Sequence, residues 1–152
     1  MSEHIDSTLS QCAQSLHALR VLRSNGLNID SLHVVFNAVI MAKLFYAAPA
    51  WWGFAITADE IRIDAFLRRC KKYGYYRPDS SCSSKDIVCT AEKMLFRRVV
   101  ANAHHVLYPL LPAEKAHNYD LRKRTHNFSL PVKSSALNDR NFFSRLLYED
   151  CY

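Results

Sequence analysis

The sequence predicts a mainly α-helical protein, a small bundle of about four to six helices followed by an irregular, partly extended C-terminal tail. Of its 152 residues 49% are hydrophobic, enough for the core of one domain, with or without an appendage. Three glycines and five prolines are too few for a turn-dense all-β fold or a disordered chain. Several stretches repeat apolar residues every three or four positions, as one helix face does. We therefore expect a helical bundle over residues 1–112 and a tail with a short helix over residues 113–152.

The first helix is expected over residues 5–25. Asn25-Gly26 follows it, and glycine readily adopts the left-handed conformation that ends many helices. An amphipathic helix of this kind should pack its apolar face against the rest of the bundle. That face contains Ile5, Leu9, Cys12, Leu16, Leu19 and Leu22.

A second helix is expected over residues 30–48. Asp30 and Ser31 are both good N-caps, because their side chains accept hydrogen bonds from free backbone N–H groups. Pro49 should end the helix, because its ring disfavours helical geometry in the preceding residue. Apolar residues lie nearly all round it, so we expect it to be buried between other helices. They are Leu32, Val35, Phe36, Val39, Ile40, Leu44 and Tyr46.

The longest apolar stretch, residues 34–54, is interrupted by Asn37, Lys43 and Pro49. A membrane-spanning helix needs about 20 largely uninterrupted apolar residues, so we interpret the stretch as a buried helix and expect no membrane contact. The N-terminus is polar, without a secretory signal, and the five cysteines are odd in number and widely spaced. These features predict an intracellular protein, nuclear or cytoplasmic rather than secreted, with reduced thiols.

Residues 51–54, Trp-Trp-Gly-Phe, form a predicted aromatic turn, and we assign its two tryptophans to the core. A third helix is expected to begin at Thr57, which with Glu60 fits a capping box. Gly74 should close this helix. Its expected inner face contains Ile61, Ala65, Phe66 and Cys70.

A polar loop over residues 75–84 follows the third helix. Ser83 or Ser84 is expected to cap a short segment toward Ala91, and a further helix is expected over residues 91–102. In this helix we expect Leu95, Val99 and Val100 to face inward and Lys93, Arg97 and Arg98 to be solvated. The last predicted helix covers residues 137–148.

The charge pattern favours a polyanion as partner. Twenty basic against fourteen acidic residues give a net charge of +6, and residues 1–50 contribute three of each sign. One basic cluster mixes cations with tyrosines, which can contact phosphates, sugars or exposed bases. Its predicted nucleic-acid-binding residues are Arg68, Arg69, Lys71, Lys72 and Arg77, interleaved with Tyr73, Tyr75 and Tyr76. A second, weaker cluster contains Arg122, Lys123, Arg124 and His126; either cluster can also be an ordinary solvated surface.

No motif predicts a metal or a cofactor. Cys70, Cys82 and Cys89 with His104 or His105 lack the closely spaced pairs that zinc sites use, so we interpret these cysteines as buried or incidental. The histidine pair is interpreted as a helix stop. We expect no cofactor and no metal site.

The last third of the chain carries the run Y-x-L-R-x-R-x-H, L-P, N-F and R-x-L-Y-x-D-x-Y. It resembles the closing segment of reverse transcriptases from jockey-like non-LTR retrotransposons (LINE elements). The matching positions are Tyr119, Leu121, Arg122, Arg124, His126, Leu130, Pro131, Asn141, Phe142, Arg145, Leu147, Tyr148, Asp150 and Tyr152.

Earlier segments resemble the thumb region of the same polymerases. The run His4-Ile5-Asp6 with Leu19, Arg20, Leu22 and Arg23 is similar to the first thumb helix. The end of the second thumb helix is matched by Lys43, Leu44, Tyr46, Ala47, Ala50, Trp51, Trp52 and Gly53.

The resemblance implies the thumb and tail of an RNA-directed DNA polymerase, whose thumb contacts an RNA–DNA or other nucleic-acid duplex. Such a polymerase also needs palm and fingers, with a pair of palm carboxylates that hold Mg²⁺. The chain has no Asp-Asp pair, and we interpret Asp59-Glu60 and Glu149-Asp150 as helix-end or surface acids. We therefore expect a non-catalytic remnant, not an enzyme.

Two alternatives remain open. One is a small helical protein-interaction module without nucleic-acid binding. The remote one is the N-terminal segment of an AlkB-like tRNA-modifying protein that lacks the dioxygenase or methyltransferase core. His4-Ile5-Asp6 matches half of a dioxygenase metal triad, but that site needs a barrel of strands which the pattern does not predict.

Overall fold

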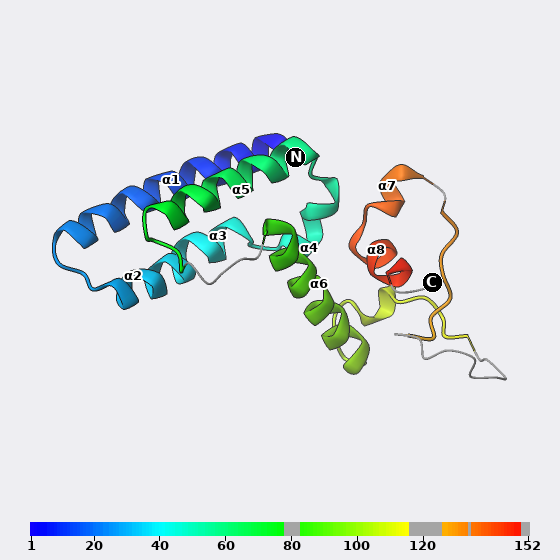
Figure 1. The fold of residues 1–152 in the computed structure, drawn as a ribbon. Coiled ribbons are helices and arrows are strands. Elements are labelled where there is room, and N and C mark those ends of the chain that lie inside the picture. The colour runs from blue at the N-terminus through cyan, green and yellow to red at the C-terminus, as the bar shows by residue number, and fades with distance from the viewer. Residues whose placement is uncertain (78–82, 116–125, 134, 150–152) are drawn as a thin grey trace. The chain divides into compact units, whose positions relative to one another are not determined.

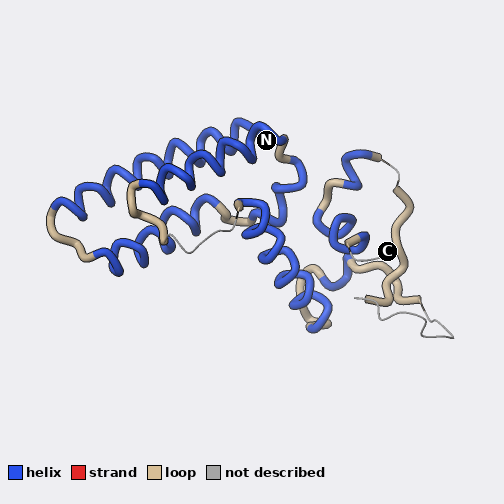
Figure 2. Tube along the Cα trace, viewed as in Figure 1, coloured by secondary structure: helices blue, strands red, loops and turns tan. Residues whose placement is uncertain are grey.

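The computed structural model describes residues 1–77, 83–115, 126–133 and 135–149, and these are mainly helical, as predicted (Figures 1 and 2). No strand occurs in these ranges; an isolated antiparallel bridge joins Glu114 to Phe128. The chain forms two compact units: Met1–Ala48 with Ala55–Val88, and Pro49–Phe54 with Cys89–Tyr152. The boundary expected near residue 112 falls inside the second unit.

Helix α1 (Ser2–Ser24) and the segments that follow it form a helical hairpin in the first unit. Gly26 has φ 91°, and its N–H donates to the carbonyl of Arg23, so the predicted glycine stop is confirmed. The buried positions Ile5, Cys12 and Leu19 lie seven residues apart. Leu22, expected on the inner face, is instead 45% exposed, because it lies in the last turn before the hairpin loop.

The second half of the hairpin consists of α2 (Ile29–Val35), a π-helix (Phe36–Met41) and α3 (Ala42–Leu44). Its N-cap is Asn28, whose Oδ1 accepts a hydrogen bond from the Ser31 N–H at 2.7 Å, so the predicted caps Asp30 and Ser31 are wrong. Residues four apart in an α-helix do not lie directly above one another, because one turn takes about 3.6 residues. A π-turn has more residues per turn, which reduces this angular offset. This spacing places one buried row against α1: Leu32, Phe36, Ile40 and Leu44.

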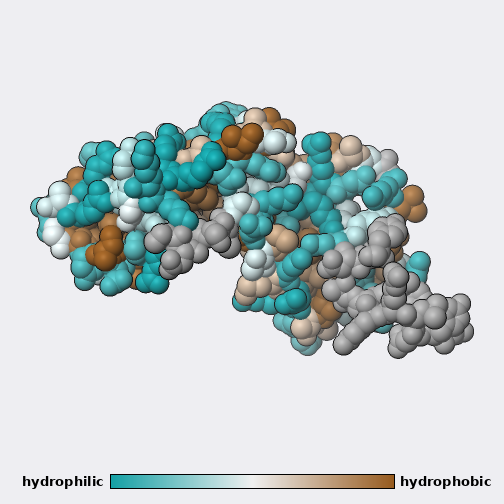
Figure 3. Space-filling model, viewed as in Figure 1, coloured by the Kyte–Doolittle hydropathy of each residue, from teal (hydrophilic) through white to brown (hydrophobic). Residues whose placement is uncertain are grey.

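The expected burial of this helix on all sides is wrong. Val34 is 65% exposed, because the helix buries one row of side chains rather than its whole circumference, and Tyr46, beyond the end of α3, is 79% exposed. Residues Ile29–Phe54 are long and apolar enough to cross a membrane by length and composition, a test that core helices of soluble proteins also pass. On the face drawn in Figure 3, hydrophobic residues form separate patches rather than a continuous band.

The second helix ends earlier than predicted. Helix α3 stops at Leu44, and Ala47 has the left-handed φ of 49°, which breaks the helix two residues before Pro49. Pro49 itself lies in the first turn of α4 (Ala48–Trp51), where proline costs no hydrogen bond. A 3₁₀ helix (Trp52–Phe54) completes the aromatic turn.

Helix α5 (Thr57–Lys72) packs beside α1 in the first unit. The predicted capping box is wrong: the N-cap is Ile56, which has no side-chain hydrogen bond, and Thr57 is the first helical residue. Ile61 was expected inside but is 58% exposed. The buried face instead contains Ile63, Phe66, Leu67 and Cys70, and Gly74, at φ 74°, follows the helix end as predicted.

Helix α6 (Ser84–Ala101) is continuous, where a short segment and a separate helix were expected. Ser83 caps it as predicted: its Oγ and the carboxylate of Asp86 exchange hydrogen bonds with each other's backbone N–H. Val99 is buried as expected. Val100 is 38% exposed, and Phe96, three residues before Val99 on the same helix face, is buried instead.

The helix predicted over residues 137–148 is two helices, α7 (Ala136–Asp139) and α8 (Phe142–Tyr148). Asn141 separates them, because its side chain accepts from the Ser144 N–H at 2.8 Å and starts a new helix. A 3₁₀ helix (Tyr108–Leu110) lies between α6 and α7 in the sequence. The core of this second unit contains Phe96, Leu146 and Leu147 with half-buried Leu111, Phe128, Phe142 and Phe143.

The tryptophan pair is buried, as predicted. Trp51 is 9% exposed and Trp52 6%, and their ring centroids lie 5.6 Å apart. Gly53 beside them is closely approached by the backbone of Arg140 and the guanidinium of Arg145, so a side chain there would clash. The aromatic turn therefore serves as packing for the second unit.

Candidate nucleic-acid interface

Helices α1 and α5 run parallel, side by side, along the first unit (Figure 1). Near their N-terminal ends, the Ser2 hydroxyl donates to the Asp59 carboxylate at 2.9 Å and Asp6 pairs with Arg62. At the other end, the Arg23 guanidinium donates to the Tyr73 carbonyl at 2.7 Å. Both helices therefore finish at the same end of the unit.

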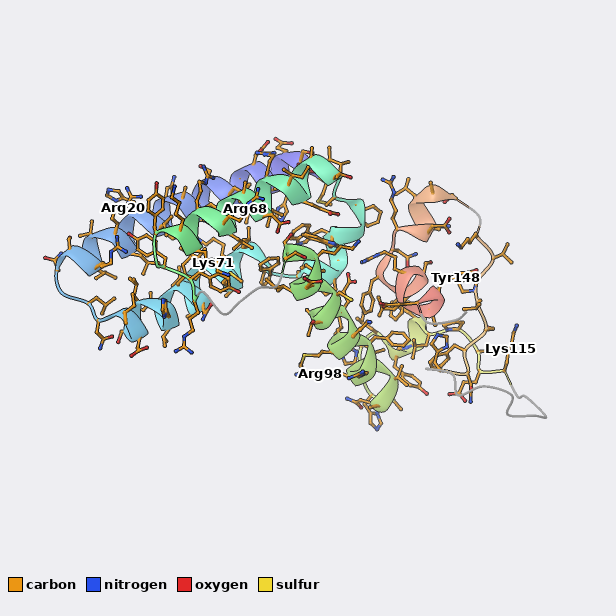
Figure 4. The ribbon with its side chains drawn as sticks, viewed as in Figure 1. Arg20, Arg68, Lys71, Arg98, Lys115 and Tyr148 are labelled. Carbon is orange, nitrogen blue, oxygen red and sulfur yellow. The ribbon has the colours of Figure 1, made fainter. Side chains whose placement is uncertain are left out.

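This arrangement joins the basic cluster of α5 to two arginines of α1. Arg20 and Arg23 lie in the last turns of α1, and Figure 4 shows Arg20 toward the end where α5 also finishes. Cations at two adjacent helix C-termini are favoured by the negative ends of both helix dipoles. We call the combined surface the basic end, which contains Arg20, Arg23, Arg68, Arg69, Lys71, Lys72 and Arg77.

The first unit is polarised in charge. The first turns of α1 and α5 carry Glu3, Asp59 and Glu60, whereas their last turns carry arginines and lysines. Most of the basic end is exposed, and Lys71 is half-buried. Arg77 and Asp30 lie 3.9 Å apart, but they are 59% and 83% exposed, so this pair holds Arg77 only weakly.

The tyrosines between these cations belong mostly to the core, which corrects the expectation that they reach sugars or bases. Tyr75 is completely buried, with the Arg23 guanidinium 4.4 Å above its ring. Tyr76 packs against Phe36 with ring centroids 5.4 Å apart. Only Tyr73 of the three is exposed, at 53%. The basic end therefore offers charges rather than a platform for stacked bases.

Most of the second predicted cluster, Arg122, Lys123 and Arg124, lies outside the residues that the structure describes. His126 is described, and it belongs to the second unit. Its Nε2 lies 3.1 Å from the Leu147 carbonyl, and its Nδ1 accepts from the Phe128 N–H. These bonds give His126 a packing role.

The acids expected on the surface differ from each other in the structure. Asp59 lies in the first turn of α5, as a helix-end acid, but it is only 2% exposed and accepts the Ser2 hydroxyl, so it is not a surface acid. Glu149 is half-buried and pairs with Lys93 at 2.9 Å. Both carboxylates are engaged in packing contacts within their own units.

Cys12 and Cys70 lie in the core of the first unit. Burial raises the pKa of the Cys70 thiol to about 12, and it also raises the pKa of Cys12. Buried thiols that stay protonated are poor nucleophiles and poor metal ligands. Within the described ranges no three His, Cys, Asp or Glu side chains are grouped to hold a metal ion.

Comparisons with known protein families, with curated proteins and with solved structures find no match for this chain. The candidate interface is therefore inferred from the residues of this chain alone.

Proposed function

We propose that this chain is a non-catalytic nucleic-acid-binding protein, the thumb and tail of a LINE-type reverse transcriptase, and that the basic end contacts a template–primer duplex. One observation carries the proposal: the parallel packing of α1 and α5 gathers cations from both helices at one end. The resemblance to the polymerase thumb adds the nature of the partner, an RNA–DNA hybrid. The palm and fingers of the parent polymerase would supply the chemistry.

The mechanism is charge contact with the phosphate backbone. Arginine donates several hydrogen bonds to phosphate oxygens, and exposed Arg68 and Arg69 can do so without leaving a buried site. Each neutralised phosphate releases condensed counterions, which lowers the binding free energy most strongly at low salt. Binding of this kind positions a duplex without reading its sequence.

The buried tyrosines favour a duplex over a single strand. Single-strand binders stack exposed bases on aromatic rings, and each stacked base adds about 1–3 kcal/mol. With Tyr75 and Tyr76 packed in the core, only Tyr73 could take this role. We therefore expect a hybrid to bind at least as well as its separate strands at equal length.

The test measures binding to a short RNA–DNA hybrid over a range of salt, by fluorescence anisotropy. Wild-type affinity should fall steeply as salt rises, and the double variant Arg68→Gln/Arg69→Gln should reduce the log–log slope by roughly 2. The matched control is Arg97→Gln/Arg98→Gln, which removes the same pair from the exposed face of α6. A wild-type slope near zero, or equal losses in both variants, would contradict the proposal.

Arg20→Gln tests whether α1 contributes to the interface. The residue is exposed and lies one turn before Arg23, so its loss should reduce the slope by about one charge. Arg23 is unsuitable for this test, because it also covers the Tyr75 ring. An unchanged slope in Arg20→Gln would restrict the interface to α5.

The alternative of a protein-interaction module has one favouring observation, the exposed apolar residues of the second helix. Val34 and Val39 are 65% and 41% exposed. The buried tryptophans are poor candidates for such contacts. Loss of a protein partner on Val34→Ser, with hybrid binding unchanged, would favour this alternative.

A further inference from the structure

The second unit contains a pocket of about 280 Å³ that the nucleic-acid proposal does not use. One side of it comes from the last turns of α6, where Phe96 and Val100 lie one turn apart. Leu146 of α8 and His126 also line it, and Lys93, Arg97 and Glu149 are its charged residues. Phe96 and Leu146 also belong to the core of the unit, so the pocket opens onto that core.

The two ring nitrogens of His126, which lines this pocket, are already occupied. The two ring nitrogens of His126 contact the Leu147 carbonyl at 3.1 Å and the Phe128 N–H at 3.2 Å. Its ring lies edge-on to Phe96, with centroids 5.9 Å apart. A nucleobase needs partners for several polar edge groups, whereas this lining suits an apolar body.

The charged groups of the pocket differ in their availability. Lys93 pairs with Glu149 at 2.9 Å, and both side chains remain partly exposed. Arg97 is exposed, and none of the described residues forms an ion pair with it. Its guanidinium is therefore available for an anionic group of a ligand in this pocket, and the planar guanidinium matches the two oxygens of a carboxylate.

We propose that this pocket binds a small apolar carboxylate, with its hydrocarbon body on Phe96, Leu146 and Val100 and its carboxylate on Arg97. A volume of about 280 Å³ accommodates on the order of a dozen non-hydrogen atoms at interior packing density. Aromatic and branched carboxylic acids have this size. A longer polypeptide segment exceeds it.

The experiment follows binding of 2-naphthoate to the full chain by chemical-shift changes of the His126 ring and of the residues near it. Saturable binding is expected, and the neutral analogue 2-naphthamide should bind about tenfold more weakly because it lacks the charge-assisted bond to Arg97. Arg97→Gln should weaken naphthoate by a similar factor and leave naphthamide unchanged.

Two variants separate pocket binding from surface attraction. Arg98→Gln removes the neighbouring charge, which projects from α6 away from α8 in Figure 4, and should leave naphthoate affinity unchanged. Val100→Phe should fill the pocket and abolish binding, with a helical signal like that of the wild type. The proposal fails if the folded wild type shows no saturable binding, or if naphthoate and naphthamide bind equally. It also fails if Arg97→Gln and Arg98→Gln weaken binding alike.

Discussion

In the first unit Arg68 and Arg69 of α5 are exposed, and no described residue pairs with either of them. In the second unit Arg145 of α8 is 25% exposed and donates to both carboxylate oxygens of Glu92, at 2.5 and 2.9 Å, and to the Arg140 carbonyl. The same side chain is thus free for a ligand in one unit and part of the fold in the other. Its role depends on what packs around it.

The cores of the two units also differ in size and composition. The first unit buries rows of apolar side chains from three helical segments, with Phe36 at 0% exposure. The second has a smaller core of aromatic and leucine side chains, and beside it the Glu92–Arg145 pair. Loss of an apolar side chain should therefore be most costly in the first unit, and loss of a single charge in the second.

The largest effect is expected from Phe36→Ala in the π-helix. A fully buried phenylalanine contacts many neighbours, and its truncation should lower the free energy of unfolding by about 4 kcal/mol. Circular dichroism in denaturant measures the change, because most of the helix belongs to this part of the chain. Val34→Ala in the adjoining α2, at a position 65% exposed in the wild type, should change it by less than about 0.5 kcal/mol. A Phe36→Ala cost below that of Val34→Ala would show that this core is wrongly placed.

Glu92→Gln should be the most costly charge substitution in the second unit. Glu92 is 5% exposed, and its substitution leaves the half-buried Arg145 guanidinium without its charged partner and with one acceptor oxygen instead of two, at a cost of about 3 kcal/mol. Tryptophan fluorescence reports this unit selectively, because Trp51 and Trp52 both belong to it.

The control is Glu149→Gln, which breaks the more exposed pair with Lys93 and should cost less than about 1 kcal/mol. Replacing both partners by apolar residues, Glu92→Leu with Arg145→Met, should restore much of the loss. Equal costs for Glu92→Gln and Glu149→Gln would mean that burial does not distinguish the two pairs.

These two regions show how far the sequence predicts the structure. Helical class, the glycine stops and the buried tryptophans follow from local patterns and are confirmed. The pairing of Glu92 with Arg145 joins residues 53 apart, and no local pattern indicates it. Arg20 joins the basic end because α1 and α5 run parallel, which sequence spacing alone does not establish.

The errors have local physical reasons. Asn28, and not Asp30, is the N-cap because the helix begins at Ile29, so Asp30 already lies inside its first turn. The tyrosines near Arg77 look available for a ligand in sequence, yet the chain after α5 folds back so that Tyr76 packs on Phe36 and Arg23 covers Tyr75. Contacts with residues distant in the sequence therefore determine whether these tyrosines are exposed.

An effect that is smaller per pH unit is expected at alkaline pH in the first unit. Burial raises the pKa of Cys70 from the ordinary value of 9.0 to about 12, so between these values the unfolded chain loses a proton that the folded chain keeps. This contribution to stability is present below pH 9 and falls as pH rises toward 12, by about 1.4 kcal/mol per pH unit.

Denaturant unfolding by circular dichroism at several pH values tests this. Cys70→Ala lowers stability at neutral pH by removing buried sulfur, but above pH 9 its stability should fall less steeply than that of the wild type. Between pH 7 and 8 the two curves should be parallel. Parallel curves through pH 11 would place the thiol in contact with solvent.

The smallest effect is expected from Asp30→Asn at the basic end. Asp30 is 83% exposed and lies 3.9 Å from Arg77, so its neutralisation should change the free energy of unfolding by less than about 0.5 kcal/mol. It removes a negative charge beside the proposed interface, so affinity for an RNA–DNA hybrid at low salt should rise about twofold. Glu3→Gln is the control, because Glu3 lies in the first turn of α1, at the other end of the unit. A rise for both variants would mean that net charge alone attracts the hybrid, whereas a rise confined to Asp30→Asn would locate the contact at the basic end.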